Sequence, residues 1–115
     1  MVARRRYVPE RGDIVWLDFE PIRGHEQGGR RPALIVSRKI YNVKTGLALV
    51  CPITSRSKGY GFEVALTASG GIQGVVLSDH VRTLDWRVRH AAYIESVDTT
   101  VIDEVEAKLR TLIEA

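Results

Sequence analysis

The sequence predicts a mostly-β fold, a small and partly open barrel of short strands with one amphipathic helix at the C-terminal end. Two observations carry this prediction. Apolar runs of strand length follow one another at close spacing, separated by segments rich in Gly, Pro, Ser and charged residues. Only the last stretch of the chain changes to helical spacing. With 115 residues, the chain has room for one core, so we expect a single domain over residues 1–115.

The strands are predicted from alternation and from uniformly apolar runs. In 14–19, Val15 and Leu17 fall on one face and Trp16 on the other, which is the two-residue period of a strand. The run at 33–37 is too uniformly apolar to have a face in water, so we expect it to be buried on both sides. Further strands are expected at 47–53, 62–66, 74–78, 81–86 and 91–94.

Helical spacing at the C-terminal end predicts one amphipathic helix. Its apolar positions are Val101, Ile102, Val105, Leu109, Leu112 and Ile113, with charged residues between them. Asp98 stands where an N-cap is expected. We expect the apolar stripe to pack on the sheet rather than on a partner, because a small sheet must be covered. Earlier in the chain, 39–46 is expected to be a loop or one helical turn that ends at Gly46.

The basic side chains are clustered. The chain carries 17 Lys and Arg against 14 Asp and Glu, a formal charge of +3. Most of the basic residues lie in 4–6, 23–31, 56–58 and 82–89, whereas the C-terminal segment is acidic. This asymmetry suits a polyanionic partner.

Cysteine content and hydropathy indicate the compartment. The single Cys51 excludes an internal disulfide and fits a reducing environment, and its apolar surroundings predict a buried, inert thiol. The arginines at 4–6 are not followed by the apolar region of a signal peptide, and no span approaches membrane length. We therefore expect a cytoplasmic protein without membrane association.

The sequence has no Cys/His cluster with zinc spacing, no P-loop and no nucleophile elbow, so we expect no metal and no cofactor.

The segment 23–36 organises the chemistry of the chain. It is a Gly-rich polar loop that leads directly into a buried strand. Pro32 fixes its own φ and biases Arg31 toward an extended conformation, so Arg31 should be held at the mouth of a rigid element. A fixed planar cation near the carboxylate of Glu26 is suited to binding a phosphate. The alternative interpretation is an ordinary solvated hairpin loop.

A second loop begins where the strand at 47–53 ends. Thr54 stands at that end, and Arg56, Lys58 and Tyr60 follow within a few residues. A nucleic-acid surface needs cations for phosphates and a flat ring on which a base can stack. A solvated hairpin whose tyrosine lies on its own stem would show the same composition.

Arg31 and Thr54 form the strongest candidate pair for chemistry, because both stand at the ends of rigid strands. Cleaving RNA without a metal requires the 2′-OH to attack the neighbouring phosphate. Arg31 can stabilise the charge that develops on the phosphorus oxygens, and the Thr54 hydroxyl can hydrogen-bond one of them. Either Glu26 or His80 can take the 2′ proton. Arg31 itself is a poor base, because a guanidinium stays protonated.

Three stretches match the pattern of a known family. They are Gly24-x-Glu26-Gln27-x-Gly29-x-Arg31-Pro32-Ala33, Pro52-x-Thr54-Ser55 and Lys58-Gly59-Tyr60-x-Phe62-Glu63-Val64. Further matches run from Tyr7 into the final helix, so the chain resembles the MazF/PemK-type toxins over nearly its whole length. The resemblance implies an SH3-like, CcdB-like barrel with a C-terminal helix that forms a homodimer.

The resemblance also implies an activity and partners. The activity is that of a metal-independent, sequence-specific endoribonuclease that cleaves single-stranded RNA, including mRNA, and leaves a 2′,3′-cyclic phosphate and a 5′-hydroxyl. The protein would be the toxin of a type II toxin–antitoxin system and would inhibit translation and growth. Its protein partner would be a MazE-type antitoxin, whose acidic disordered tail blocks the RNA groove.

Carried over by position, the resemblance assigns catalytic roles to Arg31, Thr54 and Glu26. The expected substrate-binding residues are Gln27, Arg30, Arg56, Lys58, Asp79, His80 and Arg82. The chain departs from the pattern at His80, where the family often has Gln, and this places a titratable group near the groove. Arg30 is a second departure, which adds positive charge.

Two other classes of function compete with this interpretation. CcdB-like toxins, in resemblance, share the fold and bind DNA gyrase without cleaving RNA, but they depend on an apolar C-terminus that contains Trp. This chain ends Leu112-Ile113-Glu114-Ala115 instead. The third class is a non-catalytic RNA-binding module. Neither alternative has a use for Arg31 and Thr54 as a pair.

Overall fold

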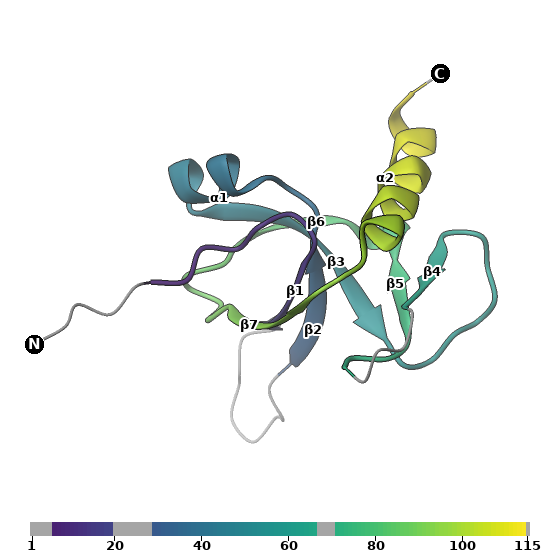
Figure 1. Cartoon of the computed structure of the whole chain (residues 1–115), viewed down its shortest axis with the longest axis horizontal. Coiled ribbons are helices and arrows are strands. Elements are labelled where there is room, and N and C mark those ends of the chain that lie inside the picture. Colours follow the sequence, from purple (N-terminus) through teal and green to yellow (C-terminus); the bar gives the residue numbers. More distant parts are fainter. Residues whose placement is uncertain (1–5, 20–28, 67–70, 115) are drawn as a thin grey trace, which may run out of the picture.

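The computed structural model describes residues 6–19, 29–66 and 71–114, and an antiparallel sheet forms its body (Figure 1). The strands are β1 (Asp13–Asp18), β2 (Arg30–Ile35), β3 (Leu47–Thr54), β4 (Glu63–Ala65), β5 (Val75–Leu77), β6 (Arg82–Asp85) and β7 (Ala92–Ser96). In the described residues they pair in the order β4-β5-β3-β2-β1-β7, and β6 also pairs with β3. Among these strands the sheet does not close on itself, which confirms the predicted partly open barrel.

Three helical segments complete the described part of the chain. They are α1 (Lys39–Thr45), the short 3-10 turn η1 (Ser78–His80) and α2 (Thr99–Ile113). The predicted stop at Gly46 is confirmed, because Gly46 caps α1 with a φ of 75° in the left-handed region. Asp98 occupies the N-cap position of α2 as predicted, but its side chain does not cap the helix. Its carboxylate accepts the hydroxyl of Thr100 instead.

The core has two parts, one on each face of the sheet, because successive side chains of a strand point to opposite faces. One part lies under α2 and includes Ile14, Leu34, Cys51, Ile53, Val64, Val76, Val101, Ile102 and Val105. The other includes Val15, Leu17, Phe19, Ala33, Ile35, Ala48, Val50, Leu84 and Trp86. Residues 33–37 contribute to both parts and are buried or half-buried, which confirms the expectation that this uniformly apolar run has no face in water.

The last turn of α2 corrects one sequence prediction. The sequence predicts that the apolar stripe packs on the sheet, and Val101, Ile102 and Val105 are buried there, with Leu109 partly buried beside them. Leu112 and Ile113 remain exposed by 47% and 83%, because the end of the helix projects past the sheet (Figure 1). None of the helices in the described ranges is long and apolar enough to cross a membrane.

Candidate active site

The pairing of β2 with β3 puts Arg31 and Thr54 on one face of the sheet. Ala33 pairs with Pro52, and Arg31 and Thr54 each lie two residues farther along their strands, so each points to the same face as its neighbour in that pair. Side chains directly across an antiparallel pair point to the same face. The structure thus brings together the two residues on which the sequence-based hypothesis depends.

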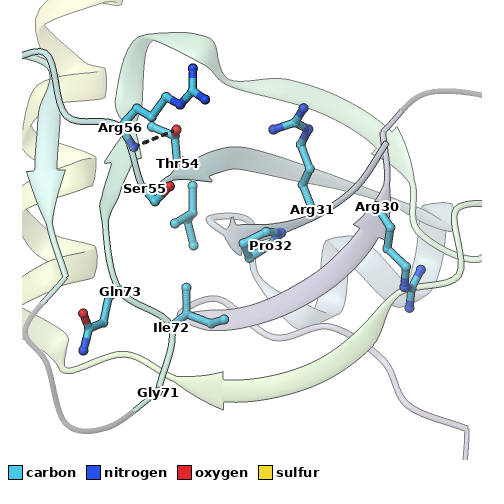
Figure 2. Close-up of a pocket in the computed structure, with 10 residues that line it drawn as sticks. Arg30, Arg31, Pro32, Thr54, Ser55, Arg56, Gly71, Ile72 and Gln73 are labelled. Atoms are coloured by element: carbon cyan, nitrogen blue, oxygen red, sulfur yellow. Dashed lines mark hydrogen bonds between the residues drawn. The ribbon is translucent and has the colours of Figure 1, made fainter. Parts of the chain in front are cut away.

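A cavity of about 850 Å³ opens where the two strands end. It is lined by Arg30, Arg31, Pro32, Ile53, Thr54, Ser55, Arg56, Gly71, Ile72 and Gln73. Figure 2 shows the guanidinium of Arg31 and the hydroxyl of Thr54 turned toward the same side of this cavity, whereas the side chain of Arg30 turns away. A site of this size, open to solvent and lined by cations, suits a segment of a polyanion better than a small apolar ligand.

The backbone fixes Thr54 on two sides. Its own strand continues into a pairing with Val75 on β5, and its Oγ1 accepts the backbone N–H of Arg56 at 3.1 Å. Because the oxygen accepts this bond, the hydroxyl hydrogen remains able to donate to a phosphate oxygen. Arg31, one residue before Pro32, is exposed on the other wall of the cavity. The pair can therefore hold a phosphate between a charged donor and a neutral one.

Of the other predicted cations, Arg56 lines the cavity, while Lys58 and Arg82 do not. All three are exposed. The guanidinium of Arg82 stacks over the ring of Phe19, 5.5 Å from its centroid. Since Val50, the partner of Arg82 in the sheet, belongs to the same core part as Phe19, Arg82 lies on the same face of the sheet as Arg31. It can extend a positive surface beyond the cavity.

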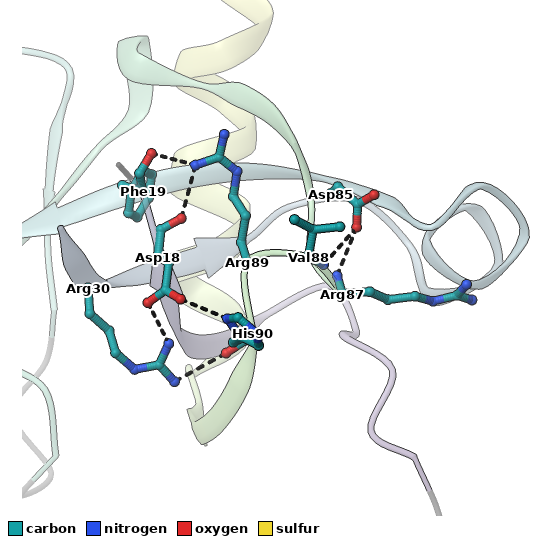
Figure 3. Close-up of polar contacts among 8 residues, drawn as sticks. All are labelled: Asp18, Phe19, Arg30, Asp85, Arg87, Val88, Arg89 and His90. Carbon is teal, nitrogen blue, oxygen red and sulfur yellow. Dashed lines mark hydrogen bonds and ion pairs between the residues drawn. The ribbon is translucent and has the colours of Figure 1, made fainter. Parts of the chain in front are cut away.

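Arg30 is held by other protein groups (Figure 3). Its Nη1 donates to Asp18 Oδ1 at 2.9 Å and its Nη2 donates to the backbone oxygen of His90 at 3.1 Å. His90 Nδ1 lies 2.9 Å from the second oxygen of the Asp18 carboxylate. The hydrogen bonds of Asp18 with His90 and with Arg30 lower the pKa of its carboxyl group. These contacts join the ends of β1 and β2 to the turn before β7, and we call this cluster of Asp18, Arg30 and His90 the strand-end latch.

Asp79 and His80 lie in η1, outside the lining of the cavity. Asp79 accepts the hydroxyl of Tyr60 at 2.9 Å, and His80 Nε2 lies 3.8 Å from the same carboxylate. Tyr60 is therefore attached to η1 rather than to its own stem. Its ring is still partly exposed and available for stacking.

Two predicted site residues, Glu26 and Gln27, lie outside the described residues. The catalytic role expected for Glu26 and the substrate-binding role expected for Gln27 stay predictions. Among the described residues, no group of three or more His, Cys, Asp or Glu side chains is arranged to hold a metal ion.

Sequence reasoning did not identify the wall formed by Gly71, Ile72 and Gln73. This wall reaches the cavity because β5, which follows it, pairs with the end of β3. No local pattern in the sequence indicates which strand β5 joins. The glycines at 71 and 74 were the available signal, because they mark an irregular segment at the entry to a strand.

Comparison with known proteins identifies relatives over nearly the whole chain. Residues 10–113 match the family described as "PemK-like, MazF-like toxin of type II toxin-antitoxin system". The chain is 44% identical over 108 residues to "Endoribonuclease toxin MazF" of Escherichia coli strain K12, covering 94% of this chain and 96% of that protein. It is 38% identical over 116 residues to "Endoribonuclease PemK" of Escherichia coli, covering 97% and 87%.

A solved structure shows the same likeness in three dimensions. The crystal structure of MazE-MazF (Form-II) from Deinococcus radiodurans includes a chain that is 55% identical to this one, with a TM-score of 0.88. The match covers 94% of this chain and 97% of that chain. This agreement confirms the fold class predicted from the sequence.

Proposed function

Because this chain belongs to the family of PemK-like, MazF-like toxins of type II toxin-antitoxin systems, we infer that it is an endoribonuclease toxin. The relatives reported above are named endoribonucleases. The single observation in the structure that carries the inference is the shared cavity of Arg31 and Thr54, with Arg56 on its rim. A gyrase-binding protein that cleaves nothing, the alternative of the same fold, needs no such pair.

The substrate we propose is single-stranded RNA, including mRNA, cleaved in a sequence-specific manner. The 2′ oxygen attacks the adjacent phosphorus, the bond from phosphorus to the 5′ oxygen breaks, and a 2′,3′-cyclic phosphate and a 5′-hydroxyl remain. Arg31 stabilises the negative charge that develops on the phosphorus oxygens, and Thr54 donates a hydrogen bond to one of them. Glu26 or His80 takes the proton from the 2′ oxygen, and a proton is delivered to the 5′ oxygen as it leaves.

The proposal extends to partners. MazE–MazF complexes from Deinococcus radiodurans support an acidic antitoxin of the MazE type as the protein partner. The positive rim formed by Arg31 and Arg56 suits an acidic chain as well as RNA. The exposed Leu112 and Ile113 at the end of α2 support a homodimer, in which a second subunit covers apolar side chains. The cytoplasm, where mRNA is translated, is the proposed site of action.

Mapping the ends of RNA fragments tests this proposal. Purified protein is incubated with a long RNA in excess chelator, and the 5′ and 3′ ends of the products are identified. We expect cuts at one recurring short sequence, with 5′-hydroxyl and 2′,3′-cyclic phosphate ends. The Arg31→Ala variant, prepared in the same way, controls for a contaminating nuclease and should produce no cuts. Products with 5′-phosphate ends, or intact RNA, would contradict the proposal.

A further inference from the structure

Three donors of one loop converge on the carboxylate of Glu63, the first residue of β4. The hydroxyl of Ser57 donates to Oε1 at 2.7 Å, and the backbone N–H of Gly59 donates to the same oxygen at 3.0 Å. The backbone N–H of Lys58 donates to Oε2 at 2.8 Å. The middle of the loop between β3 and β4 is therefore folded around a carboxylate.

The conformation of the loop depends on this arrangement. Gly59 has a φ of 77°, in the left-handed region, and this allows the N–H groups of residues 58 and 59 to point to the same place. The loop is also held at its far end, where the backbone oxygen of Gly61 accepts Lys108 Nζ of α2 at 2.6 Å. The hydroxyl of Tyr60 donates to Asp79. Between these anchors and the hydrogen bond from the Arg56 N–H to Thr54, the contacts of Glu63 hold residues 57–59.

The loop held by Glu63 is the continuation of the segment that lines the cavity. Ser55 and Arg56 line the cavity directly, and Lys58 follows two residues later. A carboxylate beside a bound polyanion repels it, so Glu63 is poorly suited to contact RNA itself. The hydrogen bond from the Lys58 backbone, followed by that from Ser57, lowers the pKa of Glu63, so its acceptor oxygens are charged at neutral pH and already occupied by the loop.

We propose that Glu63 is a positioning residue for RNA cleavage, which acts by holding the backbone of Lys58 and so fixes where this cation sits on the loop that leads out of the cavity. This inference rests on the proposed function. It assigns to Glu63 an effect on RNA affinity, exerted through Lys58, and no contact with the reacting atoms. If Glu63 only stabilised the fold around β4, its replacement would lower the melting temperature but would leave the RNA affinity of the folded protein unchanged.

The Glu63→Gln variant tests the proposal. Glutamine keeps one accepting oxygen but replaces the other with an amide group that cannot accept the Lys58 N–H. We expect about tenfold weaker binding of an RNA that carries the mapped cleavage sequence with a 2′-deoxy group at the cut, a loss typical of one charge-assisted hydrogen bond. The single-turnover rate at saturating RNA should stay within about twofold of the wild type, because affinity alone is affected. Amide hydrogen exchange of Lys58 and Gly59 should become faster.

Two comparisons make the test specific. Glu106→Gln removes the same charge from a partly exposed glutamate on α2 that accepts a hydrogen bond from Arg11, and it should leave RNA affinity unchanged. Introducing Glu63→Gln into a Lys58→Ala background should cause little further loss of affinity, because the residue through which Glu63 acts is already gone.

Each outcome decides between the two proposals. If the wild type cleaves RNA but Glu63→Gln binds it as tightly, the role of Glu63 is wrong and the proposed function stands. Losses of affinity that multiply in the double variant would also contradict a role through Lys58. If the wild type cleaves no RNA, the proposed function fails and the positioning role fails with it. In that case unchanged amide exchange in Glu63→Gln would show independently that the carboxylate does not shape the loop.

Discussion

At the scale of single residues, two prolines explain why Arg31 and Thr54 are accessible to a ligand. The strand pairing between β2 and β3 ends at Ala33 with Pro52, and Pro32 follows toward the cavity. Proline has no backbone N–H, so neither proline can donate to a continued ladder. Beyond this point β3 pairs with β5 instead, and the cavity opens between β2 and β3. The effect of Pro32 on Arg31 was predictable from the sequence, because it acts on the neighbouring residue.

Cys51 allows a prediction about reactivity at the same scale. Burial raises the pKa of its thiol to about 12, and the side chain is fully buried. Since the thiolate is the reactive form, a thiol reagent at neutral pH should modify the native protein only as fast as the protein unfolds. Measuring the modification rate across a urea gradient checks this. Rapid modification without denaturant would show that Cys51 is accessible in the native state.

At the scale of elements, the entry to β5 is fitted closely against the end of β3. Gly74 has a φ of 123°, and a Cβ added there would lie 2.2 Å from the backbone oxygen of Thr54. A backbone atom cannot move aside as a flexible side chain can. Any side chain at position 74 must therefore displace Thr54 or β5, which begins at the next residue. This contact links a residue outside the predicted site to the candidate catalytic hydroxyl.

We therefore predict that Gly74→Ala lowers both stability and cleavage. The free energy of unfolding should fall by about 2–4 kcal/mol, from the clash and the left-handed backbone together, and cleavage should fall more than tenfold. Urea denaturation and single-turnover cleavage measure the two effects. Gly61→Ala is the matched control, because an added Cβ there meets no atom within 4 Å. Equal behaviour of the two variants would contradict the contact with Thr54.

The strand-end latch makes a prediction about pH. The pKa of Asp18 is lowered in the folded protein by His90 and then by Arg30. A lowered pKa stabilises the fold above the ordinary pKa of aspartate, and this contribution disappears as the pH falls through the folded value. Asp18→Asn should therefore have a lower melting temperature than the wild type at neutral pH. The corresponding loss in the free energy of unfolding should be about 1 kcal/mol or less, because these side chains are partly exposed.

The difference in melting temperature between the wild type and Asp18→Asn is the measurement. It should shrink as the pH falls into the acid range below the ordinary pKa of aspartate. A difference that stays constant from neutral to acid pH would show that the latch contributes no charge-dependent stability.

At the scale of the whole molecule, the sequence predicted the strands, the C-terminal helix and the pair Arg31 and Thr54, because each depends on local pattern. It could not predict which groups bind the loops. The charge of Arg30 suggested RNA contact, yet its guanidinium is held by Asp18, which is distant in sequence. The role of Glu63 in the loop could not be predicted either, because two of its three hydrogen-bond donors are backbone N–H groups, which no residue pattern reveals.

The distribution of charge predicts how RNA binding depends on salt. Each phosphate neutralised on a single strand contributes about 0.7 to the slope of log affinity against log salt. Arg56→Gln should therefore lower the slope by about 0.7, because Arg56 lines the cavity. Arg110→Gln, on the exposed side of α2, should leave the slope unchanged. Equal slopes for Arg56→Gln and the wild type would place the RNA elsewhere.

The central claim is that Arg31 and Thr54 act together on one phosphate. A double-mutant cycle of single-turnover RNA cleavage tests it most directly, with wild type, Arg31→Ala, Thr54→Ala and the double variant, each shown to be folded by circular dichroism. Each single variant should lose at least about a hundredfold in rate, as expected for a donor that stabilises developing charge. The double variant should be little slower than the slower single variant. Losses that multiply, or a single variant that cleaves at the wild-type rate, would contradict the claim.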